Sequence, residues 1–149
     1  MRPSVQGSSL LISLVLLIIS AVGVRAQVVF PQEEGGKATM KCIIEMPKAY
    51  VSGLCILRRE GETVKGSIFN EFGISAMDFT YRIDKDKVKL HTVVKMMDKW
   101  YIRRTLKADL REVMKELRRG GRRYENKRNR ITYTFDPIER GGGESDGSR

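Results

Sequence analysis

The sequence predicts an α+β fold: a curled antiparallel sheet of about six strands, half-barrel-like, with one principal helix packed on its concave face. Between residues 38 and 96, successive segments alternate apolar and polar residues and are separated by short turns, which is typical of an antiparallel meander. From residue 98 the apolar period becomes helical. Residues 51–57 are apolar on both parities, and one helix cannot cover both faces of a sheet, so we expect the sheet to curl.

The first strand is predicted over residues 38–46, where Met40 and Cys42 share the apolar parity. A turn at 47–49 leads to the central strand, and a charged turn at 58–62 follows it. Further strands are predicted at residues 63–72, 75–83 and 87–96, with a break at Gly73 and a polar turn at residues 84–86.

The helix is predicted over residues 98–119, with Asp98 as its N-cap and Gly120-Gly121 as its stop. Its apolar stripe recurs every three or four residues and comprises Ile102, Leu106, Leu110, Val113 and Leu117. Residues 122–130 are predicted to be a basic loop. Alternation of Ile131, Tyr133 and Phe135 predicts a last strand that ends at Pro137.

The amino terminus has the pattern of a secretion signal over residues 1–26. Arg2 supplies a positive start, and an uncharged apolar run over residues 10–24 is shorter than the roughly 18 residues of a spanning helix. We therefore expect a signal peptide at 1–26, a single domain at 27–137 and a disordered tail at 138–149. The predicted localisation is periplasmic or secreted, with an uncut membrane anchor as the alternative.

The net charge of +10 favours anionic partners such as lipid head groups, lipopolysaccharide phosphates or nucleic acid. Export argues against nucleic acid. A docking patch for an anionic membrane or an acidic cell-envelope protein is predicted at seven cations, the alternative being a solvated loop: Arg118, Arg119, Arg122, Arg123, Lys127, Arg128 and Arg130.

Catalytic patterns are absent from the sequence. His91 shares the polar face of its strand with lysines, and the carboxylates at Glu71, Asp78, Asp98 and Asp109 are scattered. No phosphate loop, dinucleotide fingerprint or paired cysteine motif is present. We expect no catalytic residues, no metal and no cofactor, and a weaker third hypothesis is a hydrolase with dispersed carboxylates.

Cys42 and Cys55 are the only cysteines. A hairpin centred between Lys48 and Ala49 would set them opposite each other, near disulfide range. An oxidising exported compartment would permit that bridge. The alternative is two buried thiols out of register.

A curled sheet under one helix predicts an apolar groove for lipid or acyl chains, and flexible methionines suit such a surface. The alternative is a solid core, with function carried by the basic segment. The predicted groove lining is Ile68, Phe72, Met77, Phe79, Tyr81, Val88 and Leu90, with Leu106, Leu110 and Met114 as a lid.

Three short motifs carry a family resemblance: GLCILR at residues 53–58, GSIFNEFGI at 66–74, and Asp78-Phe79. They resemble small exported, often lipoprotein, sequences of Gram-negative bacteria, which are similar to the outer-membrane lipoprotein carrier and receptor (LolA/LolB-like) superfamily. The resemblance implies an open half-barrel whose helices lid a cavity for acyl chains. This chain departs from it in lacking a lipidation cysteine and in having one clear helix. Asn70 and Glu71 would either fix the turn at Gly73 or tether a ligand head group.

Overall fold

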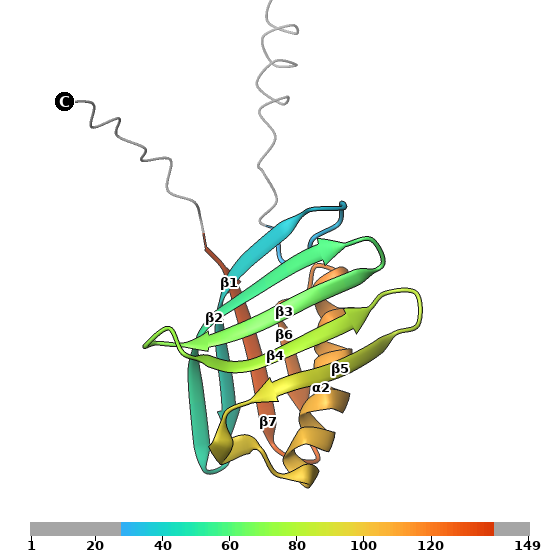
Figure 1. The fold of residues 1–149 in the computed structure, drawn as a ribbon. Coiled ribbons are helices and arrows are strands. Elements are labelled where there is room, and N and C mark those ends of the chain that lie inside the picture. Colours follow the sequence, from blue (N-terminus) through green and yellow to red (C-terminus); the bar gives the residue numbers. More distant parts are fainter. Residues whose placement is uncertain (1–27, 139–149) are drawn as a thin grey trace, which may run out of the picture.

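Seven antiparallel strands form a single sheet in the computed structural model, which describes residues 28–138 (Figure 1). Their spatial order is β5-β4-β3-β2-β1-β7-β6. The predicted α+β fold with a curled antiparallel sheet and one helix is confirmed, with seven strands instead of about six. The strands are β1 (Lys37–Met46), β2 (Ala49–Glu60), β3 (Thr63–Asn70), β4 (Ser75–Arg82), β5 (Lys87–Val93), β6 (Arg123–Asn126) and β7 (Ile131–Pro137).

The helix α2 (Trp100–Arg118) follows a short 3₁₀ turn, η1 (Lys95–Met97), and packs against the two edge strands, β5 and β6 (Figure 1). The sheet curls so that these edges approach the helix from either side. Register shifts at Ile68/Phe69 and Asp78/Phe79 mark irregularities in β3 and β4, and such irregularities bend a strand and increase its twist. These irregularities in β3 and β4 therefore contribute locally to the curl.

Two glycines allow close approach inside the sheet. A side chain at Gly53 in β2 would overlap the backbone carbonyl of Phe69, and one at Gly66 in β3 would overlap the ring of Phe79. Both residues are buried, so neither site has room to expand toward solvent. Glycine is required there because of space and not because of backbone angle.

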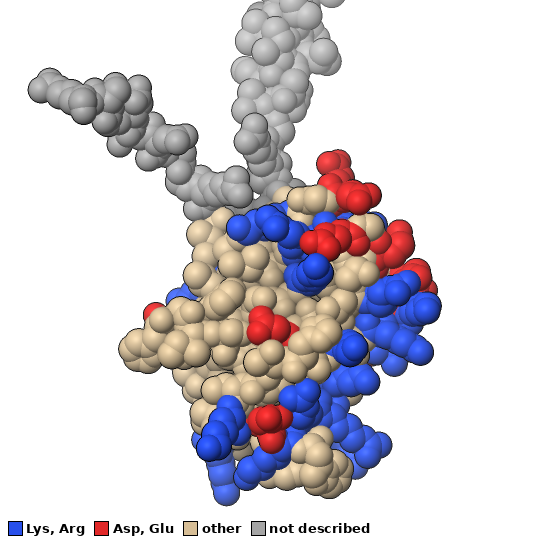
Figure 2. Space-filling model, viewed as in Figure 1, with Lys and Arg blue, Asp and Glu red and all other residues tan. Residues whose placement is uncertain are grey.

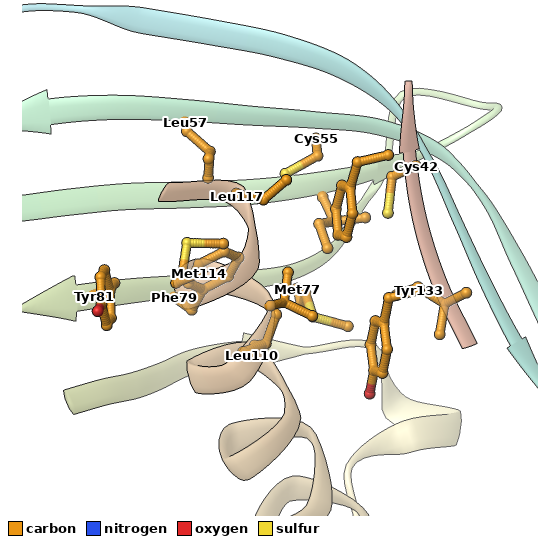
Figure 3. Close-up of a cluster of buried hydrophobic side chains, with 14 of the residues drawn as sticks. Cys42, Cys55, Leu57, Met77, Phe79, Tyr81, Leu110, Met114, Leu117 and Tyr133 are labelled. Carbon is orange, nitrogen blue, oxygen red and sulfur yellow. The ribbon is translucent and has the colours of Figure 1, made fainter. Parts of the chain in front are cut away.

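The core fills the concave side of the sheet. Side chains from the concave face, including Leu57, Met77 and Phe79, meet Leu110 and Met114 of α2 (Figure 3). All five are nearly or fully buried. The apolar stripe of the helix therefore packs against the sheet as the period of the sequence predicts.

Several element bounds differ from the predictions. The helix begins at Trp100 and not at Asp98, whose carboxylate instead accepts a hydrogen bond from Arg103. β5 ends at Val93, because the chain turns into η1 before Met96. β3 ends at Asn70, whose side chain accepts hydrogen bonds from the backbone N–H groups of Phe72 and Ile74. Asn70 thus fixes the turn at Gly73, where φ is +75°.

The predicted basic loop at 122–130 is wrong, because β6 occupies Arg123–Asn126. This strand has only four residues, and its charged side chains hide the strand pattern. The predicted signal at 1–26 lies outside the described residues, as does the predicted tail except for Ile138. Across residues 28–138, no helix combines the length and apolar character needed to cross a bilayer.

Candidate functional site

The predicted groove is occupied by protein. Of its ten predicted lining residues, eight are exposed by 4% or less, which leaves no water-sized space beside them: Ile68, Met77, Phe79, Tyr81, Val88, Leu106, Leu110 and Met114. Leu90 is half-buried. Phe72 lies outside the core on the β3–β4 turn, where it is 85% exposed. In this structure the buried lining residues border no open groove, because the lid side chains fill the concave side that they were expected to cover. Ligand binding by these residues remains a prediction.

The hairpin register that would set Cys42 opposite Cys55 is wrong, and the cysteines fit the alternative of two buried thiols out of register. The β1–β2 turn contains two residues, Pro47 and Lys48, so Met46 faces Ala49. That register sets Cys42 opposite Gly53, and Cys55 opposite Met40. Both cysteines are free and buried. Burial raises the pKa of Cys42 to about 12, and burial together with the nearby Cys42 raises that of Cys55 well above its usual value.

The seven cations of the predicted docking patch occupy different elements. Arg118 and Arg119 end α2, and Arg123 begins β6. Arg122 lies between these two elements, whereas Lys127, Arg128 and Arg130 lie in the β6–β7 turn. The structure therefore divides the patch into a group at the helix end and a group at the hairpin turn.

A more continuous basic surface follows the outward side of α2. Cations recur there with helical spacing and adjoin two exposed lysines of β5. Figure 2 shows Lys and Arg gathered along the side of the molecule where Figure 1 shows β5 and α2. We name this surface the basic face and define it by Lys87, Lys89, Arg104, Lys107, Arg111, Lys115 and Arg118.

Asp86 is the carboxylate of the β4–β5 turn that enters this surface. It accepts hydrogen bonds from Arg111 Nε at 2.9 Å and from Tyr81 OH at 2.9 Å, and it pairs with Lys115 Nζ at 3.1 Å. Burial raises the pKa of Asp86, but the hydrogen bonds from Arg111, Lys115 and Tyr81 more than offset this and leave the pKa below its usual value. Asp86 thus stays ionised at neutral pH and neutralises part of the basic face.

The remaining cations of the basic face have no internal counter-charge. Within residues 28–138, Lys87, Lys89, Arg104 and Lys107 form no ion pair. Arg118 donates a hydrogen bond to Tyr81 OH at 3.2 Å. A phenol is uncharged at neutral pH, and burial raises the pKa of Tyr81 further. An open depression of about 480 Å³ lies between Asp86, Lys115, Arg118 and Arg119. This surface can attract and hold anionic groups.

The sequence contained the signal for this face, although the prediction missed it. Arg104, Lys107, Arg111, Lys115 and Arg118 follow one another at intervals of three or four residues. The prediction weighed the density of charge along the chain and so selected residues 118–130. The helical spacing of the charges, and not their density along the chain, indicates the continuous basic face.

A second surface exposes large apolar side chains. Tyr50, Phe72 and Met96 border an open depression of about 280 Å³, together with Val94 and Ala76. At the start of α2, Trp100 and Tyr101 are also exposed, with their rings in a T-shaped arrangement and centroids 5.9 Å apart. Exposed aromatic groups of this kind are commonly found where proteins bind partners or membranes.

Two groups with catalytic or metal-binding chemistry, His91 and Asp109, have structural partners. His91 Nε2 lies 2.6 Å from Thr80 Oγ1 on the exposed face. The buried Asp109 carboxylate accepts hydrogen bonds from Tyr133 OH and Asn126 Nδ2, each at 2.7 Å. In the described part of the chain, no three His, Cys, Asp or Glu side chains gather as a metal site requires.

Comparisons of the chain with protein-family models, with curated proteins and with solved structures find no match.

Proposed function

We propose that this protein is an exported, non-enzymatic docking module that binds an anionic membrane surface through its basic face. The observation that carries this proposal is the one-sided arrangement of cations on α2 and β5, four of which form no ion pair within residues 28–138. Folding brings these four cations, Lys87, Lys89, Arg104 and Lys107, to the side of the molecule where Arg111 and Lys115 are partly neutralised by Asp86. An external anionic surface would supply the missing counter-charges.

The magnitude of the attraction is adequate for reversible adsorption. Each Lys or Arg near an anionic bilayer contributes about 1 kcal/mol, and this contribution decays within a Debye length. Lys87, Lys89, Arg104 and Lys107 together therefore supply a few kcal/mol, more where head-group phosphates enter the depression beside Arg118. Such binding is weak, salt-sensitive and suited to a surface-docking role.

The LolA/LolB-like resemblance enters this proposal only at the level of the fold. A curled sheet with a helix on its concave side is consistent with that superfamily. Acyl-chain binding on the concave side would require α2 to move away, because Leu110 and Met114 occupy that space. Surface docking requires no such opening.

The test uses sedimentation of the purified protein with vesicles of neutral lipid, and with vesicles that contain anionic phospholipid. We expect binding to the anionic vesicles only. The variant Lys87→Gln/Lys89→Gln/Arg104→Gln/Lys107→Gln should bind at least about tenfold more weakly. Each substituted side chain is exposed, so the fold should be retained.

The matched control removes four cations elsewhere: Lys41→Gln/Arg58→Gln/Lys127→Gln/Arg128→Gln. These side chains are also exposed, and two of them belong to the hairpin turn of the predicted docking patch. An equal loss of binding in both variants would indicate a response to net charge and contradict the basic face. Binding to polyglutamate without binding to anionic vesicles would favour an acidic protein partner instead.

A further inference from the structure

The start of α2 exposes apolar groups that the fold does not use. Trp100 is 74% exposed, Met96 is 69% exposed and Tyr101 is 50% exposed. The Trp100 ring contacts the Tyr101 ring edge to face, yet much of both rings remains in contact with water. Aromatic rings of this size stabilise a protein strongly when buried, so leaving them in water forgoes that stabilisation.

Cations surround these apolar groups. Lys95 and Lys99 are exposed and form no ion pair among the described residues, and Arg104 follows one turn later in the helix. The local carboxylate, Asp98, is already paired with Arg103 at 2.8 Å. Trp and Tyr flanked by Lys and Arg are the combination enriched at the boundary between lipid head groups and hydrocarbon.

The segment that carries these side chains, η1 and the first turn of α2, is held to the rest of the fold. Met97 of η1 is buried, and its backbone N–H donates to the carbonyl of Val94 at 2.8 Å. Arg103 Nη2 donates to the carbonyl of Leu90 at 3.2 Å, which ties the first turn of α2 to β5. Met97 thus holds the segment against the core, while the side chains of Met96 and Trp100 are exposed to solvent.

Trp100 also lies on the same side of α2 as the basic face. Trp100, Arg104, Lys107 and Arg111 are separated by four, three and four residues, which places them in one row along the helix. A membrane that contacts the cations of this row therefore also meets the indole at its end. The electrostatic and apolar contacts belong to one surface.

We infer that Trp100, with Tyr101 and Met96, inserts into the interfacial layer of an anionic membrane and anchors the protein there. This inference rests on the proposed function, because the basic face brings the indole to the bilayer. The inference also narrows the class of ligand, because a ligand that contacts both the cations and the indole must offer anionic head groups and hydrocarbon together. Anionic lipid in a bilayer satisfies that requirement.

Trp100 is the only tryptophan in the chain, so its fluorescence reports on this site alone. With the full chain and anionic vesicles, we expect a blue shift of the emission and quenching by phospholipids brominated on their acyl chains. Neutral vesicles should give neither effect at the same lipid concentration. A blue shift that depends on protein concentration without lipid would indicate self-association and overturn the inference.

Substitutions test whether vesicle binding depends on Trp100 more than on another exposed apolar residue. Trp100→Ala should weaken binding to anionic vesicles about tenfold in sedimentation, and Trp100→Phe should restore much of it. Leu54→Ala is the control, because Leu54 is also an exposed apolar residue but lies on β2 in the middle of the sheet, whereas α2 packs against the edge strands β5 and β6. We expect the Leu54 variant to bind within about twofold of the wild type.

The two proposals fail in different ways. If the protein sediments with anionic vesicles but shows neither a blue shift nor bromolipid quenching, the anchor is wrong and the basic face stands. Equal effects of Trp100→Ala and Leu54→Ala would also overturn the anchor. If the protein does not sediment with anionic vesicles, the proposed function itself fails.

Discussion

Cys42 and Cys55 lie on adjacent strands and face different residues across the β1–β2 ladder. Their burial and raised pKa values keep the thiols protonated and shielded at neutral pH. We expect no reaction of the folded protein with an aromatic disulfide reagent, and reaction of both thiols in denaturant. The measurement is a thiol titration of protein purified without reductant, and absence of thiols in denaturant would indicate a bridge.

Asp109 is the buried carboxylate of the core within residues 28–138, and it holds Tyr133 and Asn126. Asp109→Ala leaves the buried Tyr133 hydroxyl without its acceptor, so the free energy of unfolding should fall by about 1–3 kcal/mol. Urea unfolding at pH 7 measures this loss. Thr132→Ala, at a half-buried site on the opposite face of β7, is the control and should cost less.

The same carboxylate predicts a pH dependence. Burial raises the pKa of Asp109 more than the hydrogen bonds from Tyr133 and Asn126 lower it. The folded state therefore binds the proton more tightly than the unfolded state, whose pKa is about 3.9. This stabilisation is complete below that value and is lost as the pH rises through the folded pKa.

Asp109→Asn removes this titration. We therefore expect wild type to lose stability relative to the Asn variant as the pH rises from about 4 through the folded pKa. Unfolding curves of both proteins at several pH values give the difference. A constant difference across that range would show that Asp109 does not titrate in this way.

At the scale of elements, periodicity located α2 to within two residues at its start and one at its end. The apolar stripe made this prediction robust, since Leu106, Leu110, Val113 and Leu117 all face the core. β6 escaped prediction because four residues with two charged side chains show no clear alternation. The hairpin register was wrong because Ala49 belongs to β2 and not to the turn, which moves the partner of each β1 residue by two positions along β2.

The β4–β5 turn contributes the main negative charge of the basic face. Asp86→Asn removes the partner of Arg111 and one of the two partners of Lys115, which keeps its ion pair with Glu112. One negative charge is lost from the basic face, and Arg111 becomes available to an external anion. Binding to anionic vesicles should therefore strengthen about fivefold, which corresponds to one charge at a membrane surface. Sedimentation measures this change.

The control for Asp86→Asn is Glu125→Gln, which removes one carboxylate from β6, outside the basic face. We expect a smaller effect from Glu125→Gln. Unchanged or weaker binding of the Asp86 variant, with its fold retained by circular dichroism, would contradict the role of the basic face.

For the whole molecule, the curl of the sheet followed from the sequence but the groove did not. The prediction of a bend rested on residues 51–57 being apolar on both parities, but only one parity of β2 is buried in the structure, and Leu54 on the other is 41% exposed. Whether the bend encloses space depends on how closely α2 approaches and on the volumes of side chains such as Phe79 and Met114. An alternating pattern predicts which face of the sheet a residue lies on, but it does not predict the distance between α2 and the sheet.

The salt dependence of vesicle binding tests the electrostatic attraction of the whole molecule to a membrane. Because the basic face is exposed, added salt screens its attraction to a membrane. We expect binding to anionic vesicles to fall on the order of tenfold as NaCl rises from about 0.05 M to about 0.5 M. Binding that is insensitive to salt would show that apolar contacts dominate.

The position of α2 between the two edge strands has a further consequence for self-association. Exposed strand edges can pair with other molecules and start fibrils, so long unprotected edges are an aggregation hazard. Here β6 is only four residues long, and β5 is flanked by the helix. Arg103 also donates a hydrogen bond to the carbonyl of Leu90 in β5. The fold therefore protects both ends of its sheet against intermolecular pairing, and concentrated protein should resist fibril formation.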